Sequence, residues 1–187
     1  GRWEEELTDL RNNVFYNWGP TNGGYAGEGG RYNFVNNYYK PGPATPKNSP
    51  VRYRIAAIGV RIKKYCMNAD GTPNAWKPME HVWGKFYVDG NIIEGNEEVT
   101  QDNWTKGFYG QINNASCDNT FTKKVKKEMR LSEPLDAGII TTHSAKQAYE
   151  LVLDQAGCSR QRDAIDIRVI EETRNGTATY IGSVTKG

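Results

Sequence analysis

A glycine-rich segment holds the residue types in this chain that best suit binding of a polar ligand. Residues 21–31 have the sequence TNGGYAGEGGR, in which five glycines surround Tyr25, Glu28 and Arg31. Glycine lets the backbone approach a ligand closely, and an aromatic face beside charged groups suits a sugar. The pattern predicts either a plain turn or the rim of a sugar-binding cleft. It does not predict a phosphate site, because no Lys-Ser/Thr pair follows and no helix is expected to begin there.

Two clusters of basic residues could contact an acidic ligand. One cluster alternates with apolar residues, and the other is a short run of lysines. They are Arg52, Arg54, Arg61, Lys63 and Lys64, and Lys123, Lys124, Lys126 and Lys127. A solvated surface is the other interpretation of both clusters. The chain as a whole has a net charge of only +2, which is too small to indicate nucleic acid, so no nucleic-acid partner is expected.

Acidic residues gather at positions 4–6 and again at Glu97, Glu98 and Asp102. Clustered carboxylates can bind calcium, which prefers oxygen ligands. Neither group has the spacing of an EF-hand loop, and adjacent carboxylates are often simply solvated. We therefore assign no metal-binding residue within this chain.

Cysteine and histidine predict neither a zinc site nor a complete disulfide framework. Cys66, Cys117 and Cys158 are an odd number of cysteines, so they cannot all pair within the chain. His81 and His143 stand apart and lack zinc-ligand spacing. No run of about 18 apolar residues indicates a membrane span.

The composition favours a turn-rich β fold. The chain has 187 residues, about the length of one domain. Apolar residues make up 37% and the mean hydropathy is −0.76, while 20 glycines and 8 prolines indicate many turns. Aromatic residues, at 11%, supply bulk where aliphatic ones are scarce. This profile fits a β-rich extracellular fold better than a helical bundle.

Three segments share one pattern, in which an asparagine precedes two apolar or aromatic residues and then a turn. Aligned on Asn13, Asn37 and Asn91, the segments are residues 8–17, 32–42 and 84–96. The first interval is 24 residues, and the second is 54, which is two periods or one period with a long insertion. Short strands repeating at such intervals are typical of a solenoid.

Paired asparagines are poor strand formers, so their place beside these strands needs a reason. In a parallel β-helix the equivalent residues of successive coils stack directly above one another. Asparagines at a stacked bend can hydrogen bond along the stack, and asparagine tolerates the left-handed backbone of a sharp bend. The sequence therefore predicts an asparagine ladder at a corner between two strands. The alternative is that the asparagine pairs cap two hairpin turns.

Between the repeats we expect loops and one exposed strand. Residues 40–50 contain four prolines and predict an extended, exposed loop. Residues 51–65 alternate apolar and basic side chains, which predicts a strand with one solvated face. Residues 66–81 predict another loop. Residues 97–130 lack a clear period and predict a long irregular segment of the kind that is usually functional.

The C-terminal fifth of the chain predicts helices. Residues 141–157 have one apolar face, and Ser144 and Gln147 have capping-box spacing. Residues 162–176 predict a second helix, and residues 177–183 a short strand or an extended tail. We expect the helix pair to cover the end or the flank of the β stack and to shield its unpaired edges.

The whole chain is therefore expected to form one domain of the all-β class with two parts. Residues 1–140 would form stacked coils with long loops, and residues 141–187 a helical extension.

Four stretches together resemble a known enzyme family. They are LRNNVFYNWGP, GGYAGEGGRYNFVNNYYKPGPAT, GKFYVDGNIIEGNEEVTQDNW and the segment TTHSAKQAYELVLDQAGCSRQRDAIDIRVIEETRNGTATY. They look like the C-terminal half of a pectate lyase of polysaccharide lyase family 1, of the type found in Bacteroidetes. The resemblance covers most of residues 7–181, and residues 46–82 and 105–135 match least.

The resemblance implies a right-handed parallel β-helix that cleaves de-esterified α-1,4-galacturonan by β-elimination. In that family calcium bridges enzyme carboxylates and the substrate uronate, and an arginine of an Arg-x-Pro-Arg segment is the general base. This chain contains no such segment. The catalytic arginine and the calcium ligands are therefore expected upstream of Gly1, and no catalytic residue is assigned within the chain. Arg2 is a candidate substrate contact beside Tyr25, Glu28 and Arg31.

The same resemblance implies pectin or polygalacturonate as the partner, together with the N-terminal half of the same protein. It also implies a bacterial protein that is secreted, periplasmic or at the cell surface. A rival interpretation is a β-helix that binds an acidic glycan without cleaving it. A third is a calcium-independent pectin lyase, which would have tryptophans in place of an acidic cluster upstream.

Overall fold

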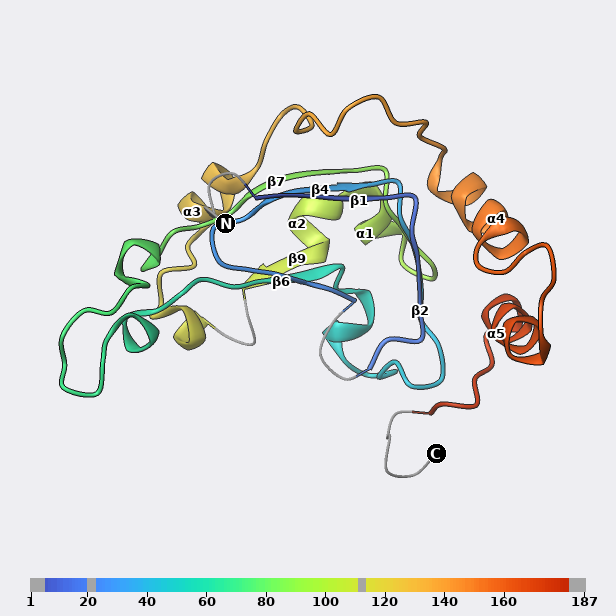
Figure 1. Ribbon diagram of the computed structural model, residues 1–187, viewed down its shortest axis with the longest axis horizontal. Coiled ribbons are helices and arrows are strands. Elements are labelled where there is room, and N and C mark those ends of the chain that lie inside the picture. The colour runs from blue at the N-terminus through green and yellow to red at the C-terminus, as the bar shows by residue number, and fades with distance from the viewer. Residues whose placement is uncertain (1–5, 20–22, 111–113, 182–187) are drawn as a thin grey trace.

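The computed structural model describes residues 6–19, 23–110 and 114–181. Strands in this part of the chain form three parallel sheets that succeed one another around a common core (Figure 1). Sheet A contains β1 (Leu7–Arg11), β4 (Arg31–Val35) and β7 (Lys85–Asp89). Sheet B contains β2 (Val14–Tyr16), β5 (Tyr38–Lys40) and β8 (Ile92–Ile93). Sheet C contains β3 (Tyr25–Ala26), β6 (Ala56–Ile58) and β9 (Phe108–Gly110).

Each coil contributes one strand to every sheet, which confirms the predicted parallel stack. In sheet A, Leu7 pairs with Arg31 and Arg31 pairs with Lys85, and sheet B continues with the same offsets. The interval of 54 residues is therefore one period with an insertion. That insertion follows β6 and carries the chain through residues 59–84 before β7 begins. The architecture is a portion resembling a parallel β-helix, with helices added to it.

The asparagine ladder is present at the bend between sheets A and B. Asn13 donates from its backbone N and from Nδ2 to Oδ1 of Asn37, both at 3.0 Å. Asn37 donates in the same way to Oδ1 of Asn91, at 3.0 and 2.8 Å. Asn91 repeats the pattern toward Asn103, a fourth member that the repeats did not predict. Asn37 and Asn91 are completely buried, so the ladder satisfies backbone groups that water does not reach.

The left-handed backbone of the bend belongs to the residue before each ladder asparagine. Asn12, Asn36 and Gly90 have φ of 56°, 51° and 67°. Asparagine and glycine are the residues that adopt this conformation most readily. The sequence prediction gave both tasks to one asparagine, but the structure divides them. The first residue of each pair makes the turn and the second makes the ladder.

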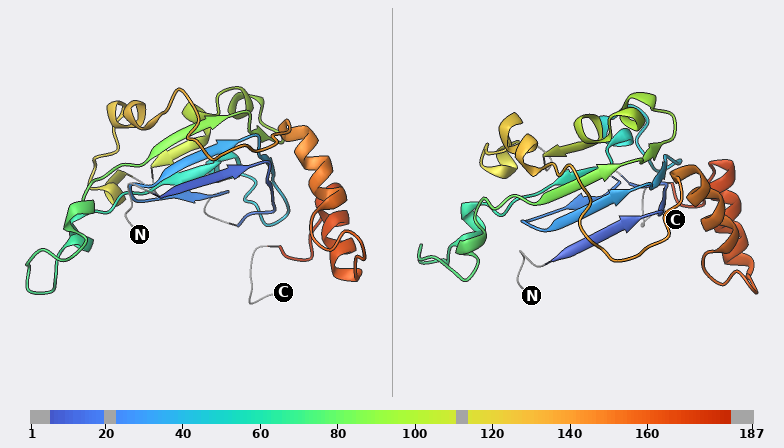
Figure 2. Two further views of the ribbon diagram at one scale, coloured as in Figure 1. Left: turned by 45° about the horizontal axis from the view of Figure 1, so that its top comes forward. Right: turned by 90° about the horizontal axis from the view of Figure 1, so that it is seen from above.

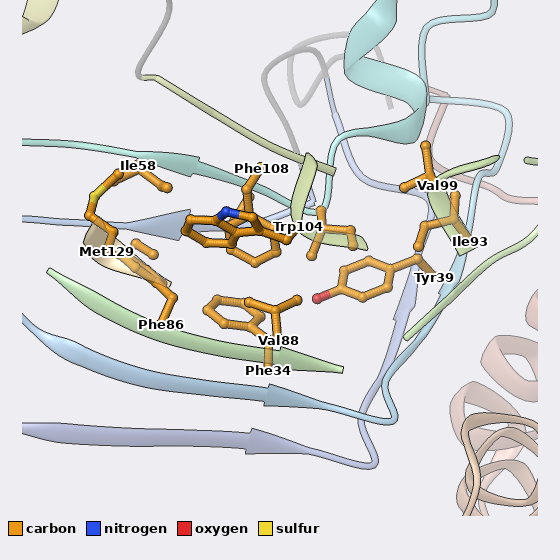
Figure 3. Close-up of a cluster of buried hydrophobic side chains, with 13 residues drawn as sticks. Phe34, Tyr39, Ile58, Phe86, Val88, Ile93, Val99, Trp104, Phe108 and Met129 are labelled. Carbon is orange, nitrogen blue, oxygen red and sulfur yellow. The ribbon is translucent and has the colours of Figure 1, made fainter. Parts of the chain in front are cut away.

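Aromatic side chains stack along the coils inside the core (Figure 3). Phe15 lies on Tyr39 of the next coil, with 4.6 Å between ring centroids and 7° between planes. Tyr32 lies on Phe86 at 5.1 Å and 9°. These pairs are register partners in sheets B and A, so strand pairing itself aligns the rings.

Two short helices cover the end of the stack, where the sequence predicted an irregular segment. Helices α1 (Glu97–Gln101) and α2 (Asn103–Gly107) connect β8 to β9 and pack on β7, β8 and β9. Figure 2 shows them beyond β7. Val99 and Trp104 are 5% exposed and extend the core. The prediction of an irregular loop over 97–130 was wrong, because these helices, β9 and α3 (Lys123–Met129) occupy most of it.

One other prediction for the middle of the chain was also wrong, and a second was correct only in part. Residues 51–65 are not one half-solvated strand, because the strand is limited to β6, whose residues are all buried. The proline-rich segment 40–50 is only partly exposed. Its Gly42 and Thr45 are buried, and Thr45 donates to the carbonyl oxygen of Trp18 at 2.8 Å.

Short 3₁₀ helices occupy much of the remaining loop structure. They span Pro50–Tyr53, Lys63–Cys66, Lys77–Met79 and Asn114–Cys117. Three of these helices follow β5 or β6 in the chain, and the fourth follows β9. Residues 66–81 are otherwise the loop that the sequence predicted, with isolated bridges between Met67 and Pro73 and between Glu80 and Arg61.

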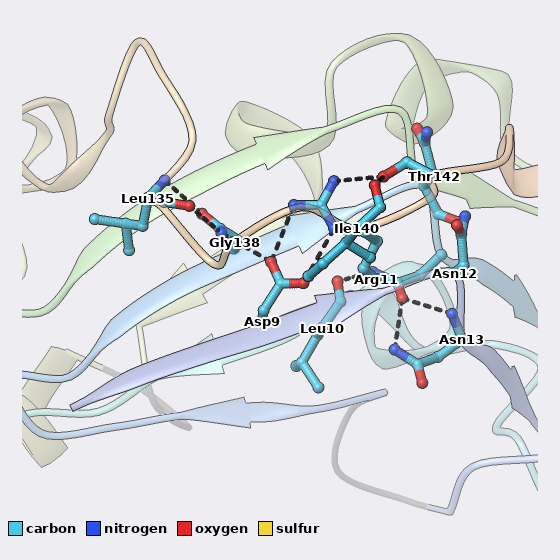
Figure 4. A network of polar contacts seen from close by, with 12 residues as sticks. Asp9, Leu10, Arg11, Asn12, Asn13, Leu135, Gly138, Ile140 and Thr142 are labelled. Atoms are coloured by element: carbon cyan, nitrogen blue, oxygen red, sulfur yellow. Dashed lines mark hydrogen bonds and ion pairs between the residues drawn. The ribbon is translucent and has the colours of Figure 1, made fainter.

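The chain after α3 runs back across the outer face of sheet A, where side-chain amides hold its backbone (Figure 4). Asn33 donates to the carbonyl oxygen of Leu135 at 2.9 Å and accepts from its N–H at 2.9 Å. Asn12 makes the same two-way contact with His143, at 2.7 and 2.8 Å. Arg11 donates to Asp9 and to Thr142 on the same face. These contacts fix the path that leads to the C-terminal helices.

The predicted helix pair is present and packs on the flank of the stack. Helix α4 (Ala145–Gln155) begins with the predicted capping box of Ser144, and α5 (Ala164–Asn175) begins at Asp163. Helix α4 contacts β2 and β5. Tyr149 of α4 packs on Tyr38 of sheet B with 4.5 Å between ring centroids.

The segment after α5 contains no strand as far as Ile181, and the rest of the predicted segment 177–183 lies outside the described residues. Within the described residues, every helix is too short or too polar to cross a membrane.

The ladder yields a first prediction. Asn37→Leu removes the acceptor for the Asn13 N–H and the donor to the Leu10 carbonyl oxygen. Leaving buried groups without partners costs about 1–3 kcal/mol each, so we expect the free energy of unfolding to fall by about 3 kcal/mol or more. Urea denaturation measures it. Asn48→Leu, at an exposed site, is the matched control. Equal stability of the two variants would contradict the role of the ladder.

The bend yields a second prediction, with two glycines of positive φ as a matched pair. Gly90 and Gly95 have φ of 67° and 82°, so alanine at either position adopts the left-handed conformation at a cost of about 1–2 kcal/mol. A Cβ at Gly90 would also overlap Oδ1 of Asn36, whereas the space around Gly95 is open. Gly90→Ala should therefore lower the thermal midpoint clearly more than Gly95→Ala. Equal shifts in calorimetry would show that the Asn36 contact is unimportant.

Candidate functional site

A surface cleft opens beside the turn that connects β3 to β4. Its volume is about 370 Å³. The side chains and backbone that line it come from the residue before β1, from β3, β4 and the turn between them, and from the insertion after β6. They are Glu6, Tyr25, Gly27, Glu28, Tyr32, Arg61, Trp76 and Met79. The glycine-rich segment therefore forms one wall of the cleft.

Glycines in two successive coils make room for the Tyr25 ring. Ala26 pairs with Ile58 in sheet C, so Gly27 and Gly59 occupy equivalent positions. A Cβ at either glycine would collide with the Tyr25 side chain. The ring thus lies close to the backbone of both coils. Tyr25 nevertheless keeps 52% of its surface exposed, so the ring remains available to a ligand.

Arg61 is the charged centre of the cleft. Its guanidinium forms an ion pair with Glu28 and lies 4.3 Å from the centroid of the Trp76 ring. The Nε atom of Arg61 is buried and has no hydrogen-bond partner. Trp76 is 52% exposed, so a second aromatic ring faces solvent next to this ion pair. Two exposed aromatic rings in one cleft with a polar pair suit the apolar faces and the hydroxyl groups of a sugar ring.

The insertion is fixed where it carries Trp76. Cys66, which is buried, contacts the carbonyl oxygen of Trp76 through Sγ at 3.4 Å. The Trp76 N–H donates to Oδ1 of Asn74 at 2.9 Å. His81 closes the insertion, donating from its backbone to the carbonyl oxygen of Arg61 at 2.9 Å. The tryptophan is therefore held by a defined loop.

Burial and nearby carboxylates shift the tyrosines of the cleft. Burial raises the pKa of Tyr25, and the charge of Glu28 raises this pKa further. Burial also raises the pKa of Tyr32, with a smaller contribution from Glu6. Tyr32 donates its hydroxyl proton to the carbonyl oxygen of Gly27 at 2.8 Å. Both phenols are thus neutral hydrogen-bonding groups at ordinary pH.

The structure brings together only part of the predicted set. Tyr25 and Glu28 line the cleft. Arg31 does not line it and lies at the start of β4, with a buried Nε that has no hydrogen-bond partner. Arg2 lies outside the described residues.

Sequence reasoning did not join Arg61 or Trp76 to the glycine-rich segment. It placed Arg61 in a basic cluster that could contact an acidic ligand or be a solvated surface, and Trp76 in a loop of no stated role. The signal that could have found Arg61 is the spacing of Gly27 and Gly59. If those glycines are treated as equivalent positions of two coils, the residues that follow each of them are neighbours in space.

The acidic residues at positions 97, 98 and 102, which could have indicated a calcium site, lie at the beginnings of two helices. Glu97 and Glu98 lie in the first turn of α1, and Asp102 caps α2 by accepting from the Thr105 N–H at 3.0 Å. Of residues 4–6, only Glu6 is described. The described residues contain no group of three or more histidine, cysteine or acidic side chains placed to hold a metal ion. They therefore do not fit the calcium ion that the family resemblance implies.

The chain matches no protein-family model and no curated protein.

The charge pairing in the cleft can be tested through Tyr25. Glu28→Gln removes the negative charge that raises the Tyr25 pKa and leaves the Arg61 cation, which lowers it. We therefore expect the pKa of Tyr25 to fall in this variant. An NMR titration of the tyrosine ring carbons measures the change, and Glu97→Gln serves as the control. An unchanged pKa would mean that the charge of Glu28 does not act on this ring.

Proposed function

We propose that this chain is the substrate-binding part of a pectate lyase of polysaccharide lyase family 1. Its reaction would be calcium-dependent β-elimination of α-1,4-linked polygalacturonate, and the chain would be part of a right-handed β-helix. On this proposal the catalytic arginine and the calcium ligands belong to residues outside this chain. No reaction step is assigned to the side chains described above.

The observation that carries the proposal is the cleft between Tyr25 and Trp76. Both rings are 52% exposed, and the ion pair of Glu28 with Arg61 lies in the cleft with them. Two exposed rings that line one cleft together with paired charges offer stacking surfaces beside hydrogen-bonding groups, which suits a saccharide. The sequence resemblance names the acidic polysaccharide, and the parallel stack with its asparagine ladder agrees with the fold that this resemblance implies.

A second candidate function is binding of an acidic glycan without cleavage. The specific observation in its favour is that every side chain invoked in the cleft belongs to this chain. The cleft needs no residue from elsewhere to bind a sugar, whereas the lyase reaction does. A protein of this kind would use the same aromatic rings and would release no product.

Substitution of the aromatic rings tests binding. Trp76→Ala should weaken binding to polygalacturonate about fivefold, because it removes one stacking surface and the support of Arg61. Tyr65→Ala is the matched control, since Tyr65 is an exposed ring of the same insertion that does not line the cleft. Isothermal titration with oligogalacturonates measures the affinity, and a neutral glucan reports the requirement for charge. Equal affinities of the two variants would reject the cleft as the sugar site.

An activity assay separates the two candidates. The chain alone, mixed with polygalacturonate and calcium, should form no unsaturated uronide chromophore. The complete polypeptide that contains this chain should form it if the lyase proposal holds, and should only bind the polymer if the second candidate holds. Product formation by the chain alone would show that the catalytic residues lie within it.

A further inference from the structure

A basic groove lies beside helix α3. It shares no lining residue with the cleft that contains Tyr25 and Trp76. It consists of two adjoining hollows of about 540 and 350 Å³ that share Lys127 and Arg130. The larger hollow is otherwise lined by Tyr87, Val88, Asp89, Leu131 and Ser132. The smaller one is otherwise lined by Trp104, Thr105, Lys123 and Lys126. We name this pair of hollows the α3 groove.

Positive charge is concentrated at this groove. Residues 123–130 contain five basic side chains and one acidic one, a net charge of +4, whereas the whole chain has only +2. The rest of the molecule therefore has a net charge of −2. A local charge of this size on an otherwise slightly acidic protein indicates a surface for an anionic ligand.

Several of these cations are free to bind a ligand. In the described part of the chain no carboxylate lies within 4.0 Å of Lys123, Lys127 or Arg130. Lys124, in contrast, approaches Glu128 at 3.9 Å and does not line either hollow. The larger hollow contains one carboxylate, that of Asp89. The groove thus presents charge that the protein neutralises only in part, through Asp89 in its lining and through the charge of Asp102, which acts on Arg130 and Lys126.

Lys126 has a different task, which is to hold the groove together. Its Nζ donates to the carbonyl oxygens of Thr105, at 3.1 Å, and of Phe108, and it lies 5.6 Å from the Trp104 ring centroid. Burial lowers its pKa to about 8. This lysine therefore attaches α3 to the end of α2 and keeps the other cations in place.

The frame of the groove is rigid because α3 is fixed at its other end as well. Arg130 forms a parallel bridge with Phe86, and the Leu131 N–H donates to the Phe86 carbonyl oxygen at 2.7 Å. Met129 is 1% exposed and anchors the helix in the core. The chain after α3 thus continues sheet A beyond β7, and Lys127 and Arg130 stand beside that edge.

We propose that the α3 groove binds carboxylates of an acidic saccharide chain, so that this protein has a second subsite, which recognises the negative charge of the ligand. The inference rests on the proposed function and deepens it. The arginine of the cleft, Arg61, is already paired with Glu28, so the α3 groove would supply the cations that bind the carboxylates of the ligand. Guanidinium and ammonium groups bind carboxylates through charge-assisted hydrogen bonds. Nucleic acid is the less suitable polyanion, because the groove's Trp104 is 5% exposed and cannot stack on a base.

Charge reversal tests the groove. The double variant Lys127→Glu with Arg130→Glu should weaken binding to oligogalacturonates at least about tenfold and should reduce the salt dependence of binding. Lys63→Glu with Lys64→Glu changes the net charge equally at exposed sites outside both hollows, and it should retain affinity within about twofold. Thermal melts check folding, and the neutral pair Lys127→Gln with Arg130→Gln provides a milder version.

The outcomes distinguish this inference from the proposed function. If the groove variant binds like the wild type while Trp76→Ala loses affinity, the groove is rejected and the cleft stands. If only the groove variant loses affinity, the groove stands and the cleft is rejected. If both double variants weaken binding equally, the effect is one of net charge and the groove is rejected. A wild-type chain that binds single-stranded DNA more tightly than oligogalacturonate, or that binds no oligogalacturonate, also overturns the inference.

Discussion

Amide side chains that hydrogen bond from one coil to the next hold the bend between sheets A and B, and the rest of the structure depends on that bend. A strand that turns sharply into another sheet leaves backbone N–H groups inside the protein without strand partners. Oδ1 of Asn37 accepts from the backbone and the side chain of Asn13, and Asn91 does the same for Asn37. The ladder therefore gives these buried groups hydrogen-bond partners, and it also keeps the coils in register.

A fixed register lets the stack tolerate long insertions. Sheets A and B keep an offset of 54 residues between the second and third coils, although the chain leaves the stack for residues 59–84 in between. Loop-closure entropy rises only slowly with loop length, so pairing on both sides of the insertion offsets its cost. The candidate site uses this freedom. Arg61 and Trp76 come from the insertion, whereas Tyr25 comes from β3 and Glu28 from the turn that follows it.

The sequence predicted the features that depend on local pattern. The period of Asn13 and Asn37 predicted stacking, and Ser144 and Asp163 predicted where the two C-terminal helices begin. It failed where packing overrides pattern. The alternation of residues 51–65 suggested a half-solvated strand, but β6 is covered on both faces and only three residues pair. Helices α1 and α2 have five residues each, too short for a periodic signal, and they form because Val99 and Trp104 close the core.

The site was predicted in part for a related reason. Tyr25 and Glu28 are close in sequence, so the glycine-rich segment reveals them together. Arg61 meets Glu28 only through the register of sheet C, and Trp76 meets Arg61 only through the path of an insertion. The α3 groove follows the same rule, since Lys127 and Arg130 reach Tyr87 and Asp89 because residue 130 bridges to β7. In this fold the stacked strands fix the positions and contribute Tyr25, and the segments between the strands supply the charges and the Trp76 ring that a ligand would contact.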